Sequence, residues 1–104
     1  MRGDICRLPA PKTAQGHEQQ GARYAVVVQS DMLPFSTVLV APTTTGSFPA
    51  VFHPQIDMGG TTVRVLAEQT RAVDGQRLGD FAGRLDAAEM ADVDRALRIV
   101  LGLF

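Results

Sequence analysis

The segment GHEQQGAR, residues 16–23, gathers side chains that can move protons and bind anions. It places His17, Glu18 and Arg23 directly ahead of a strongly apolar run. An imidazole exchanges protons near neutral pH, and a carboxylate is an alternative base. The planar guanidinium of arginine matches the oxygens of a phosphate. Each also has a plainer role: a solvated loop histidine, a carboxylate that orders the loop, and a charge at a strand edge.

Two later segments carry polar side chains beside apolar runs. Thr44 is the second of three consecutive threonines, and Thr43 and Thr45 leave its register uncertain by one position. A threonine there is by default a turn or strand-end residue. In VRVLAEQTR, Glu68 and Gln69 could bind a ligand or simply satisfy neighbouring backbone groups.

Composition limits the classes of function. The 104 residues carry a formal charge of −1, so bulk electrostatic binding of nucleic acid is not indicated. Every basic residue except Lys12 is arginine, which leaves local phosphate-binding patches open. The single cysteine, Cys6, excludes an internal disulfide and is expected to be a small buried residue. No cluster with metal-ligand spacing occurs, and we predict neither metal nor cofactor.

The length and a hydrophobic content of 45 % suit one domain over residues 1–104 with a single core. No run approaches the ~20 apolar residues of a membrane helix, and nothing resembles a signal peptide. We therefore expect a cytoplasmic protein with no membrane partner.

Short strands separated by turns must position the polar residues. Apolar or alternating runs predict strands at residues 3–8, 23–30, 37–42, 48–56, 61–73 and 81–85, the fifth being one long strand or a bent pair. The continuous apolar character of residues 37–42 predicts burial on both faces.

A change of period near residue 86 predicts one C-terminal helix. Asp86 and Glu89 form a capping-box-like start, and Gly102 stands where helices commonly end. Its apolar face is expected to comprise Met90, Val93, Leu97, Val100 and Leu101. The fold class is α+β, mainly β: a small curled β-barrel with a helix packed against it.

The chain resembles the MazF/PemK/Kid toxins. RGDICRLPAP followed by GHEQQGARYAVVVQSD is similar to their R-G-[DE]-[IL]-W start, G-x-E-Q-x-G-x-R-P loop and apolar strand. TVLVAPTTT, VLAEQTRAVD and the closing helix continue the similarity in order along nearly the whole chain. The resemblance implies an SH3-like barrel that forms a homodimer, cuts single-stranded RNA without a metal, and is blocked by a MazE-like antitoxin of a type II toxin–antitoxin pair.

The resemblance also implies roles for particular residues. The family's essential arginine and threonine fall on Arg23 and Thr44, and its loop residues fall on His17 and Glu18, giving the predicted catalytic set. The predicted RNA-binding residues are Gln19, Tyr24, Arg64, Glu68, Gln69 and Arg71. Metal-free cleavage would use the ribose 2′-hydroxyl as nucleophile, with Arg23 and Thr44 donating hydrogen bonds to the phosphate.

Departures from the family pattern concern substrate preference more than the reaction. Cys6 replaces the usual tryptophan, and Tyr24 replaces the usual proline. Leu66 stands where the Kid branch has arginine, for which Arg64, two positions back on the same strand face, could partly substitute.

Two rival readings stay open. RYAVVVQSDML, VFHPQIDMGGTTVRVL and LGLF are also similar to CcdB, a related toxin that traps DNA gyrase through the end of its C-terminal helix. Leu101, Gly102 and Phe104 would then be the gyrase contacts, although CcdB has nothing like GHEQQGAR. An inactive relative that only binds an antitoxin is the second rival.

Overall fold

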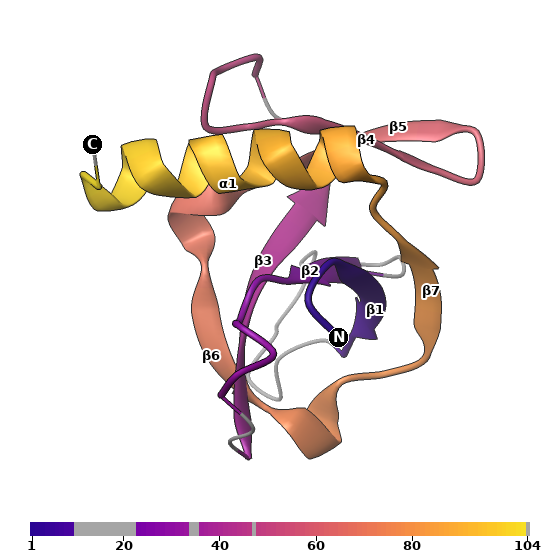
Figure 1. Ribbon diagram of the computed structural model, residues 1–104. Helices are drawn as coiled ribbons and strands as arrows, with labels where there is room; N and C mark the ends of the chain where they lie inside the picture. The colour runs from indigo at the N-terminus through magenta and orange to yellow at the C-terminus, as the bar shows by residue number, and fades with distance from the viewer. Residues whose placement is uncertain (10–22, 34–35, 47, 104) are drawn as a thin grey trace, which may run out of the picture.

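One strongly curled antiparallel sheet forms the body of the protein (Figure 1). The computed structural model describes residues 1–9, 23–33, 36–46 and 48–103. Neighbouring strands are hydrogen-bonded in the order β4-β5-β3-β2-β1-β7. Outside this order, β6 also pairs with β3. Their bounds are β1 Asp4–Leu8, β2 Arg23–Val27, β3 Thr37–Thr44, β4 Gln55–Met58, β5 Thr61–Val65, β6 Arg71–Asp74 and β7 Phe81–Arg84. The 3-10 helices η1 (Ala67–Gln69) and η2 (Gly75–Arg77) flank β6, and the helix α1 (Ala87–Leu101) follows β7.

The sheet buries apolar side chains on both faces. Because side chains alternate along a strand, Val26 contributes to one cluster while Ala25 and Val27 contribute to the other. The first cluster includes Val93 of α1, so the helix covers that face. The second lies within the curl formed by β1, β2 and β3. The predicted mainly β architecture with one packed helix is therefore confirmed.

The helix begins and ends as the sequence predicts. The Asp86 carboxylate accepts from the Glu89 N–H at 2.7 Å, and the Glu89 carboxylate accepts from the Asp86 N–H at 2.9 Å. Gly102 ends the helix in the left-handed conformation, with φ of 70°. The predicted apolar face is wrong at its end, because Leu101 is 63 % exposed and Ala96, rather than Leu101, is buried with Val93.

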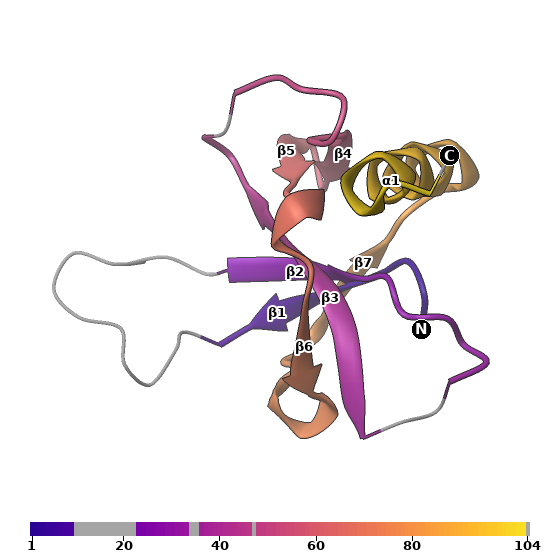
Figure 2. The same cartoon turned by 90° about the vertical axis from the view of Figure 1, so that its left-hand side faces the viewer.

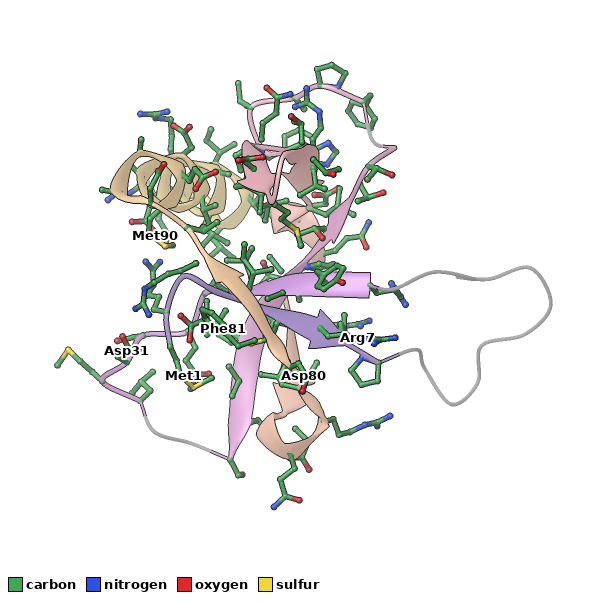
Figure 3. All side chains as sticks on the ribbon, turned by 90° about the vertical axis from the view of Figure 1, so that its right-hand side faces the viewer. Met1, Arg7, Asp31, Asp80, Phe81 and Met90 are labelled. Carbon is green, nitrogen blue, oxygen red and sulfur yellow. The ribbon has the colours of Figure 1, made fainter. Side chains whose placement is uncertain are left out.

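The N-terminus is fastened to the helix and to the turn after β2. The Arg2 guanidinium donates to the Val28 carbonyl at 3.0 Å and forms an ion pair with Asp94. The amino group of Met1 lies 3.3 Å from the Asp31 carboxylate, and Figure 3 shows these two residues side by side. These contacts hold β1 against the element that covers the sheet.

Three strand predictions need correction. Residues 48–54 are not a strand: β4 begins only at Gln55, after Pro49 and Pro54 have interrupted any ladder. β3 is not buried on both faces, since Leu39 is 42 % exposed. The segment 61–73 is the bent pair β5 and β6, but η1 forms the bend, so Glu68 and Gln69 do not lie on a strand.

Within the described residues, no helix has the length and apolar character needed to cross a membrane.

Candidate active site

Arg23 and Thr44 lie at the same end of two neighbouring antiparallel strands. β2 begins at Arg23, and β3 ends at Thr44. The antiparallel ladder of β2 and β3 ends with Ala25 opposite Pro42, two residues from Arg23 and two residues from Thr44. Two residues that are twenty-one positions apart in the sequence therefore lie at the same end of adjacent strands.

A cavity of about 720 Å³ opens at this point. Its floor comes from the ends of β2 and β3, one wall comes from the β4–β5 turn, and another comes from Leu66 and Gln69 around η1. Its lining residues are Arg23, Tyr24, Pro42, Thr43, Thr44, Thr45, Met58, Gly59, Thr61, Val63, Leu66, Gln69 and Ala82. The cavity therefore includes four predicted site residues, namely Arg23, Thr44, Tyr24 and Gln69.

The cavity is suited to a negatively charged group. Arg23 is half-buried, and no acidic side chain is among the described residues that line the hollow. The Thr44 hydroxyl oxygen accepts from the Gly46 N–H at 3.2 Å, which leaves the hydroxyl proton available for a ligand. Thr43 differs, because its hydroxyl donates to the Tyr24 carbonyl at 3.1 Å. The two neighbouring threonines thus have different partners: one is committed to the fold and the other can donate into the cavity.

Glu68 and Arg64 do not line the cavity, because both contact the buried His53. The His53 Nε2 lies 2.8 Å from Glu68 Oε2, and Arg64 Nη1 donates to the His53 carbonyl at 2.9 Å. Burial alone lowers the pKa of His53, but the hydrogen bonds to Glu68 and to the Phe48 carbonyl outweigh burial and raise it above its ordinary value. Sequence reasoning missed His53, since a histidine between Phe52 and Pro54 in a presumed strand carries no sign of its partner.

Arg71 lies at another hollow, of about 330 Å³. It is lined by Leu8, Pro9, Arg71, Ala72, Val73, Asp74 and Arg77. The register of β6 on β3 places Arg71 opposite Val40, four residues before Thr44. The structure therefore separates Arg71 from Arg23 and Thr44.

Several predicted site residues cannot be placed. His17, Glu18, Gln19 and Phe104 lie outside the described residues.

Leu101 and Gly102, the alternative gyrase contacts, lie at the exposed end of α1, and Figure 2 shows that end on the opposite side of the molecule from the start of β2. In the part of the chain that the structure describes, no group of three or more histidine, cysteine, aspartate or glutamate side chains could hold a metal ion.

Comparison with known proteins decides the family. Residues 1–101 match the family described as the PemK-like, MazF-like toxin of type II toxin-antitoxin systems. The chain belongs to this family.

Named relatives cover nearly the whole chain. A candidate toxin of Mycobacterium tuberculosis is 40 % identical over 104 residues, covering 99 % of this chain and 98 % of its own. The endoribonuclease MazF of Staphylococcus epidermidis is 34 % identical over 110 residues, covering 98 % of this chain and 91 % of its own. These alignments confirm the predicted PemK/MazF family, and the predicted enzyme class agrees with the name of the second relative.

Solved structures of the family share the fold. MazF from Deinococcus radiodurans is 26 % identical and superposes with a TM-score of 0.75, covering 96 % of this chain and 94 % of its own. The MazE–MazF complex of the same organism contains a chain that is 25 % identical, with a TM-score of 0.75 and coverage of 99 % and 96 %. The predicted small barrel with a C-terminal helix is therefore the fold of MazF.

Proposed function

We propose that this MazF-family chain is the toxin of a type II toxin–antitoxin pair and cleaves single-stranded RNA by a metal-independent transesterification. The convergence of Arg23 and Thr44 on one cavity free of lining carboxylates, among the described residues, carries the proposal. In the reaction, the 2′-oxygen attacks the adjacent phosphorus and the bond from phosphorus to the 5′-oxygen breaks. The products are a 2′,3′-cyclic phosphate and a 5′-hydroxyl.

Arg23 and Thr44 stabilise the charge that develops on the phosphorane. The guanidinium of Arg23 presents two N–H donors in a plane that fits two phosphoryl oxygens. The Thr44 hydroxyl adds a donor from the opposite strand. A preorganised donor of this kind typically changes kcat by ~10²–10³-fold, because it strengthens as the charge develops.

The proton transfers are assigned to the predicted loop residues. A base must take the proton from the 2′-hydroxyl, and an acid must give one to the departing 5′-oxygen. His17 is matched to either step near neutral pH, and Glu18 is the carboxylate alternative. A guanidinium holds its proton too tightly to act as an acid, so the role of Arg23 is charge stabilisation.

Base recognition falls to the other residues of the cavity. The half-buried Tyr24 ring can stack on a base, and the Gln69 amide can donate and accept at a base edge. Gln19 remains a predicted contact, whereas Arg64, Glu68 and Arg71 face other partners or another hollow. For Arg64 and Glu68 we therefore favour an indirect role in RNA binding.

The proposed partners are a MazE-like antitoxin and a second copy of the chain. The related MazF of Deinococcus radiodurans has been solved in complex with MazE, which supports an antitoxin that covers the cavity. We propose a homodimer of single-domain chains, residues 1–104, acting in the cytoplasm where cellular RNA is the substrate. The antitoxin tail would compete with RNA for Arg23.

One experiment tests the reaction directly. Purified protein is incubated in EDTA with a long single-stranded RNA, and the ends of the cut products are mapped. Wild type is compared with Arg23→Ala and with Arg95→Ala, a control on the exposed face of α1. We expect discrete cuts with cyclic phosphate and 5′-hydroxyl ends that vanish only in Arg23→Ala. Intact RNA across varied sequences would refute the proposal and direct attention to the α1 end and a gyrase cleavage assay.

A further inference from the structure

The segment between β3 and β4 is fastened onto β5 and η1 by backbone hydrogen bonds. The Phe52 carbonyl accepts from the Ala67 N–H at 3.3 Å, and the Pro54 carbonyl accepts from the Val65 N–H at 2.9 Å. Between them lies His53, which is 1 % exposed. Its ring contacts the rings of Phe48 and Phe52 with centroids 4.9 and 4.6 Å away. His53 is therefore held rigidly in one orientation.

Both nitrogens of the His53 ring face acceptors. Nδ1 lies 3.0 Å from the Phe48 carbonyl, which can only accept a hydrogen bond, so Nδ1 must carry a proton. Nε2 lies 2.8 Å from a carboxylate oxygen of Glu68, which accepts when ionised. The site is fully satisfied only when the imidazole carries both protons. Because Nδ1 keeps its proton for the carbonyl, loss of the other proton leaves the Nε2 lone pair facing the Glu68 carboxylate.

Glu68 connects this buried ring to the wall of the cavity. It is the middle residue of η1, between Ala67 and Gln69. Leu66 and Gln69, on either side, line the cavity that holds Arg23 and Thr44. The Leu66 N–H donates to the Pro42 carbonyl at 2.8 Å, which joins this wall to β3. A displacement of Glu68 would therefore change the position of Gln69.

We propose that the His53–Glu68 pair is a proton-controlled clasp that positions the Leu66–Gln69 wall of the cavity, so that RNA cleavage declines as His53 loses its second proton. His53 is a positioning residue, because it acts through Glu68 and does not line the cavity. The inference rests on the function proposed above, since the wall matters through its contacts with RNA.

The surrounding charges set the direction of the effect. Burial lowers the pKa of His53, Glu68 of η1 raises it, and the nearby Arg64 of β5 lowers it, with a net rise. These are the charged groups that act on the ring within the described residues. The protonated, closed state of the clasp is therefore extended above the ordinary His pKa of 6.5, and the clasp opens as the pH rises through the raised pKa. Replacing Glu68 by glutamine removes the charge that raises this pKa and supplies an amide that can also donate to the neutral ring, so the wild-type dependence on the His53 proton should be shifted to lower pH or lost.

The test combines cleavage rates with an NMR titration. kcat/KM is measured from about pH 6 to about pH 9 for wild type, Glu68→Gln and His17→Gln, with the uncatalysed rate subtracted. Asp92→Asn, a carboxylate on the exposed face of α1, is the matched control. The His53 ring and the Gln69 amide of unliganded wild type are titrated by NMR over the same range. This second arm requires neither RNA nor a variant.

We expect a wild-type fall in kcat/KM of about tenfold per pH unit above the His53 midpoint, as for one titrating proton. The fall should move to lower pH or disappear in Glu68→Gln, because a glutamine amide can also donate to the deprotonated Nε2, and it should keep its position in Asp92→Asn. His17→Gln removes a proposed proton-transfer group, so it should lower the rate without abolishing a fall that follows the His53 midpoint. The Gln69 amide should follow the His53 midpoint. A profile that moves with His17→Gln but not with Glu68→Gln, or a Gln69 amide that ignores His53, would overturn the clasp. Absence of cleavage at every pH would refute the proposed function, while the NMR arm would still decide the coupling.

Discussion

At the scale of single residues, Arg23 should be irreplaceable by another cation. Arg23→Ala removes both phosphate donors, and we expect kcat/KM to fall by ~10³-fold or more. Arg23→Lys keeps the charge but loses the planar pair of donors, so a loss of about 10²-fold is expected. Single-turnover cleavage of a defined RNA measures both. Near-complete activity in Arg23→Lys would contradict the bidentate role and leave only an attraction by charge.

Substitution of the two neighbouring threonines should have different effects, one on the cleavage rate and the other on stability. Thr44→Val removes a donor into the cavity, and we expect a loss of ~10²-fold in kcat. Its hydrogen bond from the Gly46 N–H is exposed, so the free energy of unfolding should change by less than about 0.5 kcal/mol. Thr43→Val removes the hydrogen bond to the Tyr24 carbonyl, which should lower the free energy of unfolding by about 1 kcal/mol. Urea unfolding and cleavage rates of both variants separate the two effects. The reverse assignment would show that Thr43 is the catalytic hydroxyl.

The resemblance located Arg23 and Thr44, and the cavity includes both. It could not reveal what Glu68 contacts. That contact depends on His53, fifteen residues earlier, whose burial results from the 48–54 segment folding onto β5. Residue types predict which chemistry is available, whereas the partner of a side chain is fixed by tertiary packing.

At the scale of elements, the capping box should contribute measurably to stability. Asp86→Ala removes the acceptor for the Glu89 N–H and should lower the free energy of unfolding by about 1 kcal/mol. Asp92→Ala is the control, because Asp92 forms only an exposed ion pair within the same helix and should change stability by less than about 0.5 kcal/mol. Chemical denaturation followed by circular dichroism measures both. Equal effects would mean that helix charge, rather than the cap, matters.

The segment that holds His53 should also contribute stability in a pH-dependent way. Because the folded state raises the pKa of His53 above its ordinary value of 6.5, the protonated ring stabilises the fold. This contribution is fully present below pH 6.5 and is lost as the pH rises through the raised pKa. The difference in free energy of unfolding between wild type and His53→Gln should therefore shrink as the pH rises. Denaturation curves at several pH values would contradict this if the difference stayed constant or grew.

Strands with a clear apolar pattern and the capped helix could be predicted because their local preferences agree with their final environment. The 48–54 segment could not, since its aromatic and branched residues favour a strand while Pro49 and Pro54 remove two backbone donors. The bend at η1 could not be predicted either, because the sequence LAEQ contains no glycine or proline that would indicate a bend. Local preference and tertiary arrangement disagree at both places. η1 contributes Gln69 to the cavity lining, and the 48–54 segment contacts η1 through His53 and Glu68.

At the scale of the whole molecule, the curl of the sheet explains how a short chain buries two apolar clusters. β3 pairs with three strands: with β6 along its first half, with β2 along its centre and with β5 near its end. It therefore belongs to both halves of the curled sheet. Sequence periodicity predicts which residues of a strand face inward. It does not predict which strand pairs with three others. The crossing of these pairings at Pro42–Thr44 is what brings the cavity walls together.

The charge of the whole chain predicts a weak salt dependence of RNA binding. Ten basic and eleven acidic side chains give no excess of positive charge to attract the polymer, and Arg23 is the cationic side chain among the described residues that line the cavity. If one to three phosphates are neutralised, the plot of log K against log salt should have a slope of about −0.7 to about −2, since each phosphate of a single strand contributes about −0.7.

An RNA with a 2′-deoxy nucleotide at the cleaved position lacks the proposed nucleophile, so wild-type protein can be titrated with it at equilibrium. Arg23→Ala should make the slope shallower by about 0.7, whereas Arg95→Ala should leave it unchanged. A slope steeper than about −4 in wild type would contradict a local contact and require an extended basic surface that binds many phosphates.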